Sequence, residues 1–155
     1  MAEIRGANGD DLEYMYSALY KLNEMHYIAE PEYFKAPGEI ADVKDLSKYI
    51  STENTFAYVV LNNEQYIGFA VGLIREVKSP ISQPITIGSI EEIYLEPDYR
   101  GIGIGKELNL IIERYCKHRG ATDIFTEVWG FNDAALSFYK NCGLKTHVHW
   151  LRKKL

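Results

Sequence analysis

The sequence has few cysteines, no long apolar run and no excess of basic residues. Its two cysteines, Cys116 and Cys142, are too few for a disulfide framework and lack the paired spacing of a zinc site. No apolar segment approaches the roughly 20 residues that a membrane-spanning helix requires. The net charge of −5 argues against nucleic-acid binding, which normally needs a basic face. Since the N-terminus also lacks a signal-peptide pattern, we expect a cytoplasmic protein that binds neither membranes nor nucleic acid.

The length and the charge distribution narrow the possibilities further. A chain of 155 residues with 46% hydrophobic and 25% charged residues fits one globular domain, residues 1–155. Residues 1–54 carry 11 acidic and five basic side chains, a net charge of −6, so the rest of the chain carries +1. Such a region either attracts cationic ligands or simply solubilises the surface.

Hydrophobic periodicity predicts the order of the secondary-structure elements. Strands are expected at 2–5, 55–61, 66–74, 85–95, 124–129 and 144–151, and helices at 12–26, 43–50, 103–118 and 132–141. Strands come first in this order, and a strand–helix–strand–helix–strand succession follows. The sequence therefore predicts an α/β fold with a mixed sheet and helices on both of its faces.

A glycine-rich turn, residues 100–105, lies between an expected strand and an expected helix. Backbone N–H groups at such a turn can surround an anion, and the helix dipole adds positive potential. Lys106 stands where a dinucleotide-binding fingerprint needs glycine, and Glu107 stands where a P-loop needs serine or threonine. The turn thus predicts a phosphate site of another kind.

Two motifs resemble the signatures of the GCN5-related N-acetyltransferase (GNAT) superfamily. Arg100, Gly103 and Gly105 match its acetyl-CoA-binding motif. The run from Asn132 to Leu144 is similar to its second signature, in the expected order and spacing. The resemblance covers roughly residues 85–150 and is closest to the acetyltransferases of small amines and polyamines. It implies the GNAT fold, a mixed, mostly antiparallel sheet of about six or seven strands.

The resemblance also implies which residues hold acetyl-CoA, the expected co-substrate. The amides of the glycine turn would bind its pyrophosphate, and the backbone of the preceding strand would bind its pantetheine arm, with no metal involved. Asn132 would cap the next helix and also contact the pantetheine. The expected cofactor-binding residues are Ile93, Tyr94, Leu95, Arg100, Gly101, Ile102, Gly103, Ile104, Gly105, Lys106, Asn132 and Tyr139.

Direct transfer of an acetyl group to an amine needs an acid for the departing thiolate and a base for the amine. By resemblance, Tyr139 is the acid, since a phenol can protonate a thiolate. Glu91 matches the position of a glutamate in polyamine-acetylating relatives, with Glu92 as second choice. Neighbouring strand residues face opposite sides, so at most one of the two should reach the cleft. A base that acts through water is a further alternative.

Other reactive side chains have simpler explanations. Cys142 has no histidine or acid placed near it for covalent catalysis and is expected to be a small packing residue. His147 and His149 share one strand face, which suits either a metal pair or, more commonly, surface histidines.

The acceptor site of this superfamily is usually lined by the first two helices and their loop. Here that region is acidic and aromatic, a combination that suits an ammonium group. We expect a small cationic amine bound by Tyr27, Glu30, Tyr33 and Phe34. A protein or peptide acceptor and a non-catalytic acyl-CoA sensor stay open. A homodimer through Val148, Trp150 and Leu151 is a further expectation from the resemblance.

Overall fold

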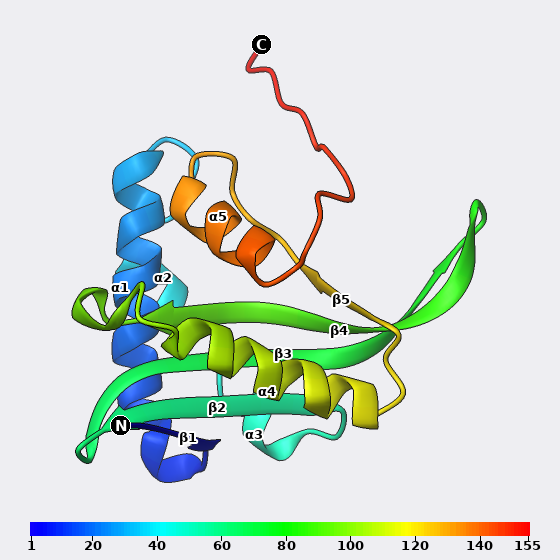
Figure 1. Cartoon of the computed structure of the whole chain (residues 1–155). Coiled ribbons are helices and arrows are strands. Elements are labelled where there is room, and N and C mark those ends of the chain that lie inside the picture. The colour runs from blue at the N-terminus through cyan, green and yellow to red at the C-terminus, as the bar shows by residue number, and fades with distance from the viewer.

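The computed structural model describes all 155 residues, and a single five-stranded sheet runs through its centre (Figure 1). The strand order is β1-β2-β3-β4-β5, so each strand lies beside its neighbour in the sequence. The strands are β1 (Ala2–Gly6), β2 (Thr55–Asn62), β3 (Gln65–Ser79), β4 (Ser82–Leu95) and β5 (Asp123–Thr126). The first four pair antiparallel and β5 joins β4 in parallel, which confirms the expected mixed sheet.

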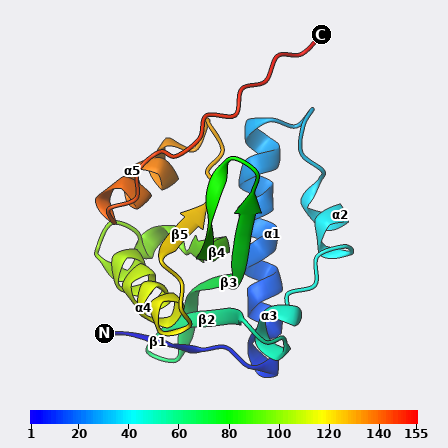
Figure 2. The ribbon, with the colours of Figure 1, turned by 90° about the vertical axis from the view of Figure 1, so that its right-hand side faces the viewer.

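Helices cover both faces of this sheet, as Figure 2 shows. One face carries α1 (Leu12–Ala29), α2 (Pro37–Ala41) and α3 (Lys48–Ser51), and the other carries α4 (Ile104–His118) and α5 (Asp133–Asn141). Two short 3-10 turns, η1 (Gly9–Asp11) and η2 (Pro97–Tyr99), precede α1 and the glycine turn. No helix is both long enough and apolar enough to span a bilayer.

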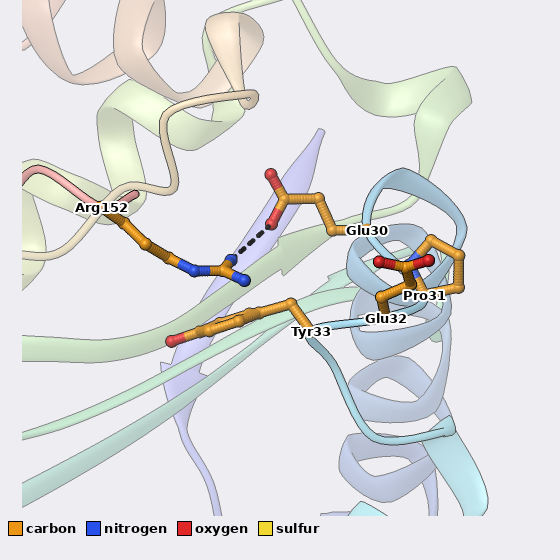
Figure 3. Close-up of a pocket in the computed structure, with 5 residues that line it drawn as sticks. All are labelled: Glu30, Pro31, Glu32, Tyr33 and Arg152. Carbon is orange, nitrogen blue, oxygen red and sulfur yellow. Dashed lines mark ion pairs between the residues drawn. The ribbon is translucent and has the colours of Figure 1, made fainter. Parts of the chain in front are cut away.

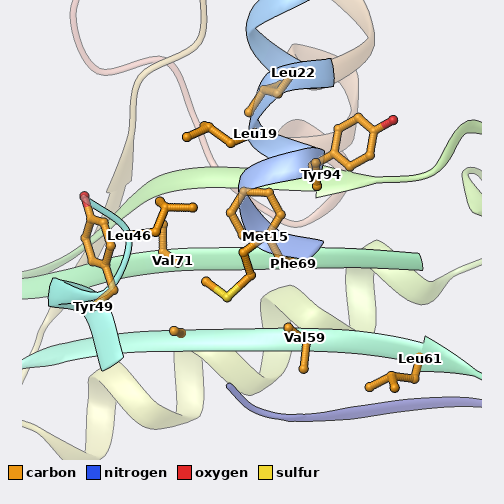
Figure 4. Packing of buried hydrophobic residues seen from close by; sticks show 12 residues of the cluster. Met15, Leu19, Leu22, Leu46, Tyr49, Val59, Leu61, Phe69, Val71 and Tyr94 are labelled. Atoms are coloured by element: carbon orange, nitrogen blue, oxygen red, sulfur yellow. The ribbon is translucent and has the colours of Figure 1, made fainter. Parts of the chain in front are cut away.

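Two hydrophobic cores hold the layers together, because each strand presents alternate side chains to opposite faces. The core under α1 packs Met15 and Leu19 against Val59, Phe69 and Val71 (Figure 4). The other core lies under α4 and α5 and includes Val60, Ile67, Ile90, Leu108, Ile112 and Tyr139. The central strands β2 to β4 therefore contribute side chains to both cores, and this packing holds β4 in place.

The expectation of six or seven strands was wrong, because residues 144–151 do not form a strand. A strand needs the edge of a neighbour for its backbone hydrogen bonds. β5 is only four residues long and offers a short edge, and the C-terminal tail, residues 144–155, has no regular secondary structure. Val148, Trp150 and Leu151 consequently remain exposed. Of the helix expected at 43–50, only its end is helical, as α3, and α2 lies in the segment before that range.

A buried carboxylate ties β1 to the start of α1. Asp11 is 1% exposed, and both its oxygens accept hydrogen bonds from the Arg5 guanidinium at 2.8 Å. The Tyr66 hydroxyl donates to Asp11 at 2.6 Å, and the Asn8 amide donates at 2.8 Å. The bonds from Arg5 and Tyr66 hold the pKa of Asp11 well below its usual range, although burial opposes them.

Asp11→Ala is expected to lower the free energy of unfolding by about 2 kcal/mol, because it leaves the Arg5 charge and the Tyr66 hydroxyl unpaired. Since the pKa of Asp11 is depressed by folding, its stabilisation is present above the unfolded pKa near 3.9 and is lost as the pH falls below it. Denaturant unfolding at pH 7 and pH 3 measures both effects. Asp10→Ala is the control, since Asp10 is exposed, and an equal loss in that variant would contradict the assignment.

Candidate active site

The end of β4 has one unpaired edge. Its antiparallel pairing with β3 continues to Leu95, but its parallel pairing with β5 stops at Ile90, opposite Thr126. Figure 1 shows β5 leaving β4 at an angle toward α5. The expected pantetheine contacts Ile93, Tyr94 and Leu95 all lie on the open stretch, whose backbone can accept an added extended chain.

The glycine turn follows this open edge and presents free amides. None of the six N–H groups from Gly101 to Lys106 donates to a backbone carbonyl, and the first such bond of the helix comes from the Glu107 amide to Gly103. Six successive free donors at the N-terminus of a 15-residue helix suit a pyrophosphate. The turn thus offers a set of donors that suits a phosphate group.

The motif residues contribute in different ways. Gly101 and Gly103 have φ of +75° and +96°, a backbone conformation that favours glycine, and a Cβ on either would meet no protein atom within 4 Å. Gly105 instead allows close packing, since a Cβ there would lie 3.0 Å from the ring of Phe138. The Arg100 side chain turns back to β4, where its Nε donates to the Leu95 carbonyl at 2.8 Å.

Tyr139 on α5 lies in the core beside the point where β4 and β5 separate. It is 5% exposed and belongs to the same buried cluster as Ile90. Burial raises the pKa of Tyr139 to about 12, although the nearby Thr126 hydroxyl opposes the shift. The phenol is therefore a proton donor throughout the neutral range. Asn132 caps α5, with its Oδ1 accepting from the Ala135 amide at 3.1 Å.

A β-bulge brings both candidate bases to one place. Val71 pairs with Glu92 and Gly72 with Ile90, so Glu91 is the extra residue of β4. Lys44 forms an ion pair with Glu92, and Glu91 also lies close enough to act on the Lys44 ammonium. Burial lowers the pKa of Lys44, and the Glu91 charge partly offsets that shift. Because a bulge interrupts strand alternation, both carboxylates act on the same ammonium group, and the choice of base between Glu91 and Glu92 stays a prediction.

An aromatic cluster joins the loop after α1 to the loop after β5. Phe34 is its centre, with ring centroids 4.8 Å from Trp129, 5.4 Å from His26 and 6.0 Å from Phe131. Tyr33 packs on Trp129 at 5.5 Å. Burial lowers the pKa of His26, and so does the positive charge of Lys44. The expected acceptor residue Phe34 therefore contacts His26, which in turn lies close enough to Lys44 to respond to its charge.

Beside the aromatic cluster, Glu30, Pro31, Glu32, Tyr33 and Arg152 line a cavity of about 340 Å³ (Figure 3). Arg152 comes from the C-terminal tail and points toward Glu30 across the Tyr33 ring. The fourth expected acceptor residue, Tyr27, is exposed and takes no part in the aromatic cluster.

Sequence reasoning missed four side chains near this region: His26, Lys44, Trp129 and Arg152. Trp129 lies only three residues before the second motif, but all four lie outside both motifs, and the tertiary contacts bring them together. Covalent catalysis by a cysteine finds no support, because burial raises the pKa of Cys116 to about 11 and also raises that of Cys142. His147 contacts Phe125 edge-on, with ring centroids 5.2 Å apart, and no group of three or more side chains suited to a metal ion is present.

Comparison with known proteins agrees with the resemblance in the motifs. The acetyltransferase (GNAT) family model matches residues 22–144. N-alpha-acetyltransferase 30 of Schizosaccharomyces pombe is 33% identical over 89 residues, which make up 57% of this chain and 56% of that relative. The matched segments span between 30% and 56% of the curated relatives' lengths.

Solved structures share the architecture over nearly the whole chain. An acetyltransferase from Vibrio fischeri is 31% identical with a TM-score of 0.65, covering 82% of this chain and 96% of that one. A mutant protein from Bacillus halodurans is 21% identical, with a TM-score of 0.87 over 99% of both chains. Aminoglycoside N-acetyltransferase AAC(6')-Iy, solved in complex with CoA, is 17% identical with a TM-score of 0.72, covering 99% of this chain and 100% of that one. The last two show likeness of fold alone.

Proposed function

This chain belongs to the acetyltransferase (GNAT) family, and we propose that it transfers the acetyl group of acetyl-CoA directly to the primary amine of a small cationic acceptor. The observation that carries the proposal is the run of six free amides, Gly101 to Lys106, directly after the open edge of β4. This arrangement offers donors for a pyrophosphate and a backbone edge for an extended arm in one continuous segment.

In this proposal, acetyl-CoA supplies the activated acetyl group as a thioester. The residues of this chain position the thioester and protonate the departing sulfur. The pantetheine is held by the backbone of Ile93, Tyr94 and Leu95. The Asn132 side chain caps α5 with its Oδ1 and can donate to the pantetheine with its Nδ2 group. Arg100 steadies the end of the β4 edge through its bond to the Leu95 carbonyl. Tyr139 donates its phenolic proton to the sulfur as the C–S bond breaks.

Glu91 is the better candidate for the base. Glu92 is engaged by Lys44, whereas Glu91 accepts only a hydrogen bond from the Ser89 hydroxyl, at 3.0 Å, and lies exposed at the bulge. A free carboxylate can take the amine proton, directly or through a water molecule.

Glu91→Gln is expected to lower kcat/KM about tenfold near neutral pH, because the acceptor amine then loses its proton to solvent alone. The loss should shrink as the pH approaches the pKa of the amine, near 10.4 for a lysine-like group. A pH series of kcat/KM measures both effects, with Glu92→Gln as the matched variant. A larger, pH-dependent loss in Glu92→Gln would transfer the role to Glu92.

The acceptor class rests on the chemistry of the loop after α1. Glu30 supplies negative charge, and the rings of Tyr33 and Phe34 supply faces that attract cations. An aminoglycoside, which carries several amines, is the substrate class named for one protein of the same fold. Tyr27 stands one turn before this loop and would contact a longer acceptor. Because Lys44 is positively charged, we expect the ammonium group of the acceptor to bind nearer to Glu30 than to Lys44.

A peptide acceptor is the second candidate, favoured by the relative named N-alpha-acetyltransferase 30. An acyl-CoA sensor would bind the thioester without turnover. A homodimer that covers the exposed Val148, Trp150 and Leu151 stays a prediction, which sedimentation at several protein concentrations can test.

Release of free thiol from acetyl-CoA tests the function across a panel of polyamines, aminosugars, amino acids and short peptides. Blanks without acceptor correct for Cys116 and Cys142. Turnover with polyamines or aminosugars is the expected result. Turnover with peptides alone would move the assignment to a peptide acetyltransferase, and binding of acetyl-CoA without any turnover would indicate a sensor.

A further inference from the structure

The C-terminal tail places two cations on the acidic loop after α1. The Arg152 guanidinium lies 4.0 Å from the Glu30 carboxylate and 4.5 Å over the Tyr33 ring (Figure 3). Two residues later, Lys154 Nζ lies 3.2 Å from the Glu32 carboxylate. Lys153, between them, contacts no carboxylate within 4.0 Å. The paired residues are therefore two positions apart both in the tail and in the loop.

We propose that this surface is a binding site for a ligand with two cationic groups, and that Arg152 and Lys154 occupy it as an internal competitor. This inference rests on the proposed function, because it specifies the acceptor class of the same site. Alternate residues of an extended chain lie about 6.6 Å apart, so the two cationic groups of the ligand should have a similar spacing.

The contacts of Arg152 and Lys154 with the loop are weak enough for a ligand to replace them. Glu30, Glu32, Arg152 and Lys154 are all more than 40% exposed, and ion pairs with such exposure are individually weak. The tail forms no strand or helix that would anchor it. A ligand can therefore displace Arg152 and Lys154 without unfolding any element, and the Tyr33 ring then meets the incoming cation.

Occupancy by the tail reduces apparent affinity in proportion to the fraction of sites that remain free. With two exposed ion pairs and one cation–π contact, we expect about three- to tenfold weaker binding than in a chain without these cations. The effect should fade at high ionic strength, because exposed charges are screened.

The test compares R152A/K154A with K145A/K153A in the full-length chain. Both double variants lose two cations from the tail, but Lys145 and Lys153 form no ion pair. All proteins also carry W150F, which leaves Trp129, packed on Tyr33, as the single tryptophan. Quenching of Trp129 fluorescence reports the dissociation constants of two probes, spermidine and a blocked Arg-Ala-Lys tripeptide, without acetyl-CoA. Hydrogen exchange of residues 30–34 reports the tail contact itself.

The expected result is about three- to tenfold tighter binding by R152A/K154A alone, with faster exchange of residues 30–34 in that variant. Tighter binding of spermidine identifies a polyamine-like ligand, and tighter binding of the tripeptide alone identifies a peptide. Equal affinities in the two double variants, unchanged exchange, or weaker binding by R152A/K154A would each overturn the proposal. Loss of the exchange difference on dilution would overturn the internal contact in favour of a second copy. Because neither readout involves turnover, these outcomes are independent of whether acetyl transfer occurs.

Discussion

Tyr139→Phe is expected to lower kcat between about 10- and 1000-fold while the affinity for acetyl-CoA stays within about twofold of the original. The substitution removes one oxygen atom from a side chain that is 5% exposed, so packing in the α5 core is preserved. The departing thiolate then has no positioned proton donor. Steady-state kinetics and calorimetric titration with acetyl-CoA measure the two quantities separately.

Tyr115→Phe is the matched control for this experiment. Tyr115 lies against the same core, and its hydroxyl donates to the Thr55 carbonyl at 2.8 Å. Its loss should cost about 1 kcal/mol of stability and leave kcat unchanged. In the original protein, the pKa of Tyr139 near 12 predicts no decline of kcat from this group up to pH 10, where an ordinary phenol would be half ionised. Full activity in Tyr139→Phe would remove Tyr139 as the acid.

Gly103→Ala is expected to raise the dissociation constant for acetyl-CoA about 10- to 100-fold. At φ of +96°, a side chain is strained, and relief of that strain turns the neighbouring amides away from a common centre. The new methyl group also projects into the open space before the helix, where no protein atom lies within 4 Å. Hydrogen bonds to a charged group are among the strongest, so loss of even one or two explains the range.

Gly120→Ala is the control that separates a loss of phosphate binding at the glycine turn from the general cost of backbone strain. Gly120 has φ of +90° and equally open surroundings, but it follows the C-terminal end of α4. Both variants should lose similar stability in denaturant unfolding, while only Gly103→Ala loses affinity for acetyl-CoA. Equal affinity in the original protein and Gly103→Ala would contradict the assignment of the glycine turn to phosphate.

The sequence predicted the parts of the fold that local patterns determine. The glycine turn, the helix after it and the Asn132 cap depend on short-range chemistry, and all three are present. The missing sixth strand shows the opposite case, because residues 144–151 have a strand-like pattern but only the short edge of β5 is available to them. Whether the tail pairs depends on the length of β5, and the sequence of the tail itself gives no information about that length.

The candidate site was predictable to a similar degree. Residues within the two motifs could be identified by their spacing, but Lys44 and Arg152 are single charged residues without a local signature. The bulge at Glu91 could not be foreseen either, since it depends on the register between β3 and β4. The acidic, aromatic loop could be singled out from its composition, and its role in acceptor binding stays a prediction, whereas its pairing with the tail emerges only from the tertiary structure.

Incubation with isotopically labelled acetyl-CoA and spermidine, followed by mass spectrometry, tests acetyl transfer most directly. We predict one acetyl group on a spermidine primary amine for each free CoA released, with the label in the product. Release of CoA without labelled spermidine, or with the label on the protein instead, would contradict direct transfer to a small cationic amine.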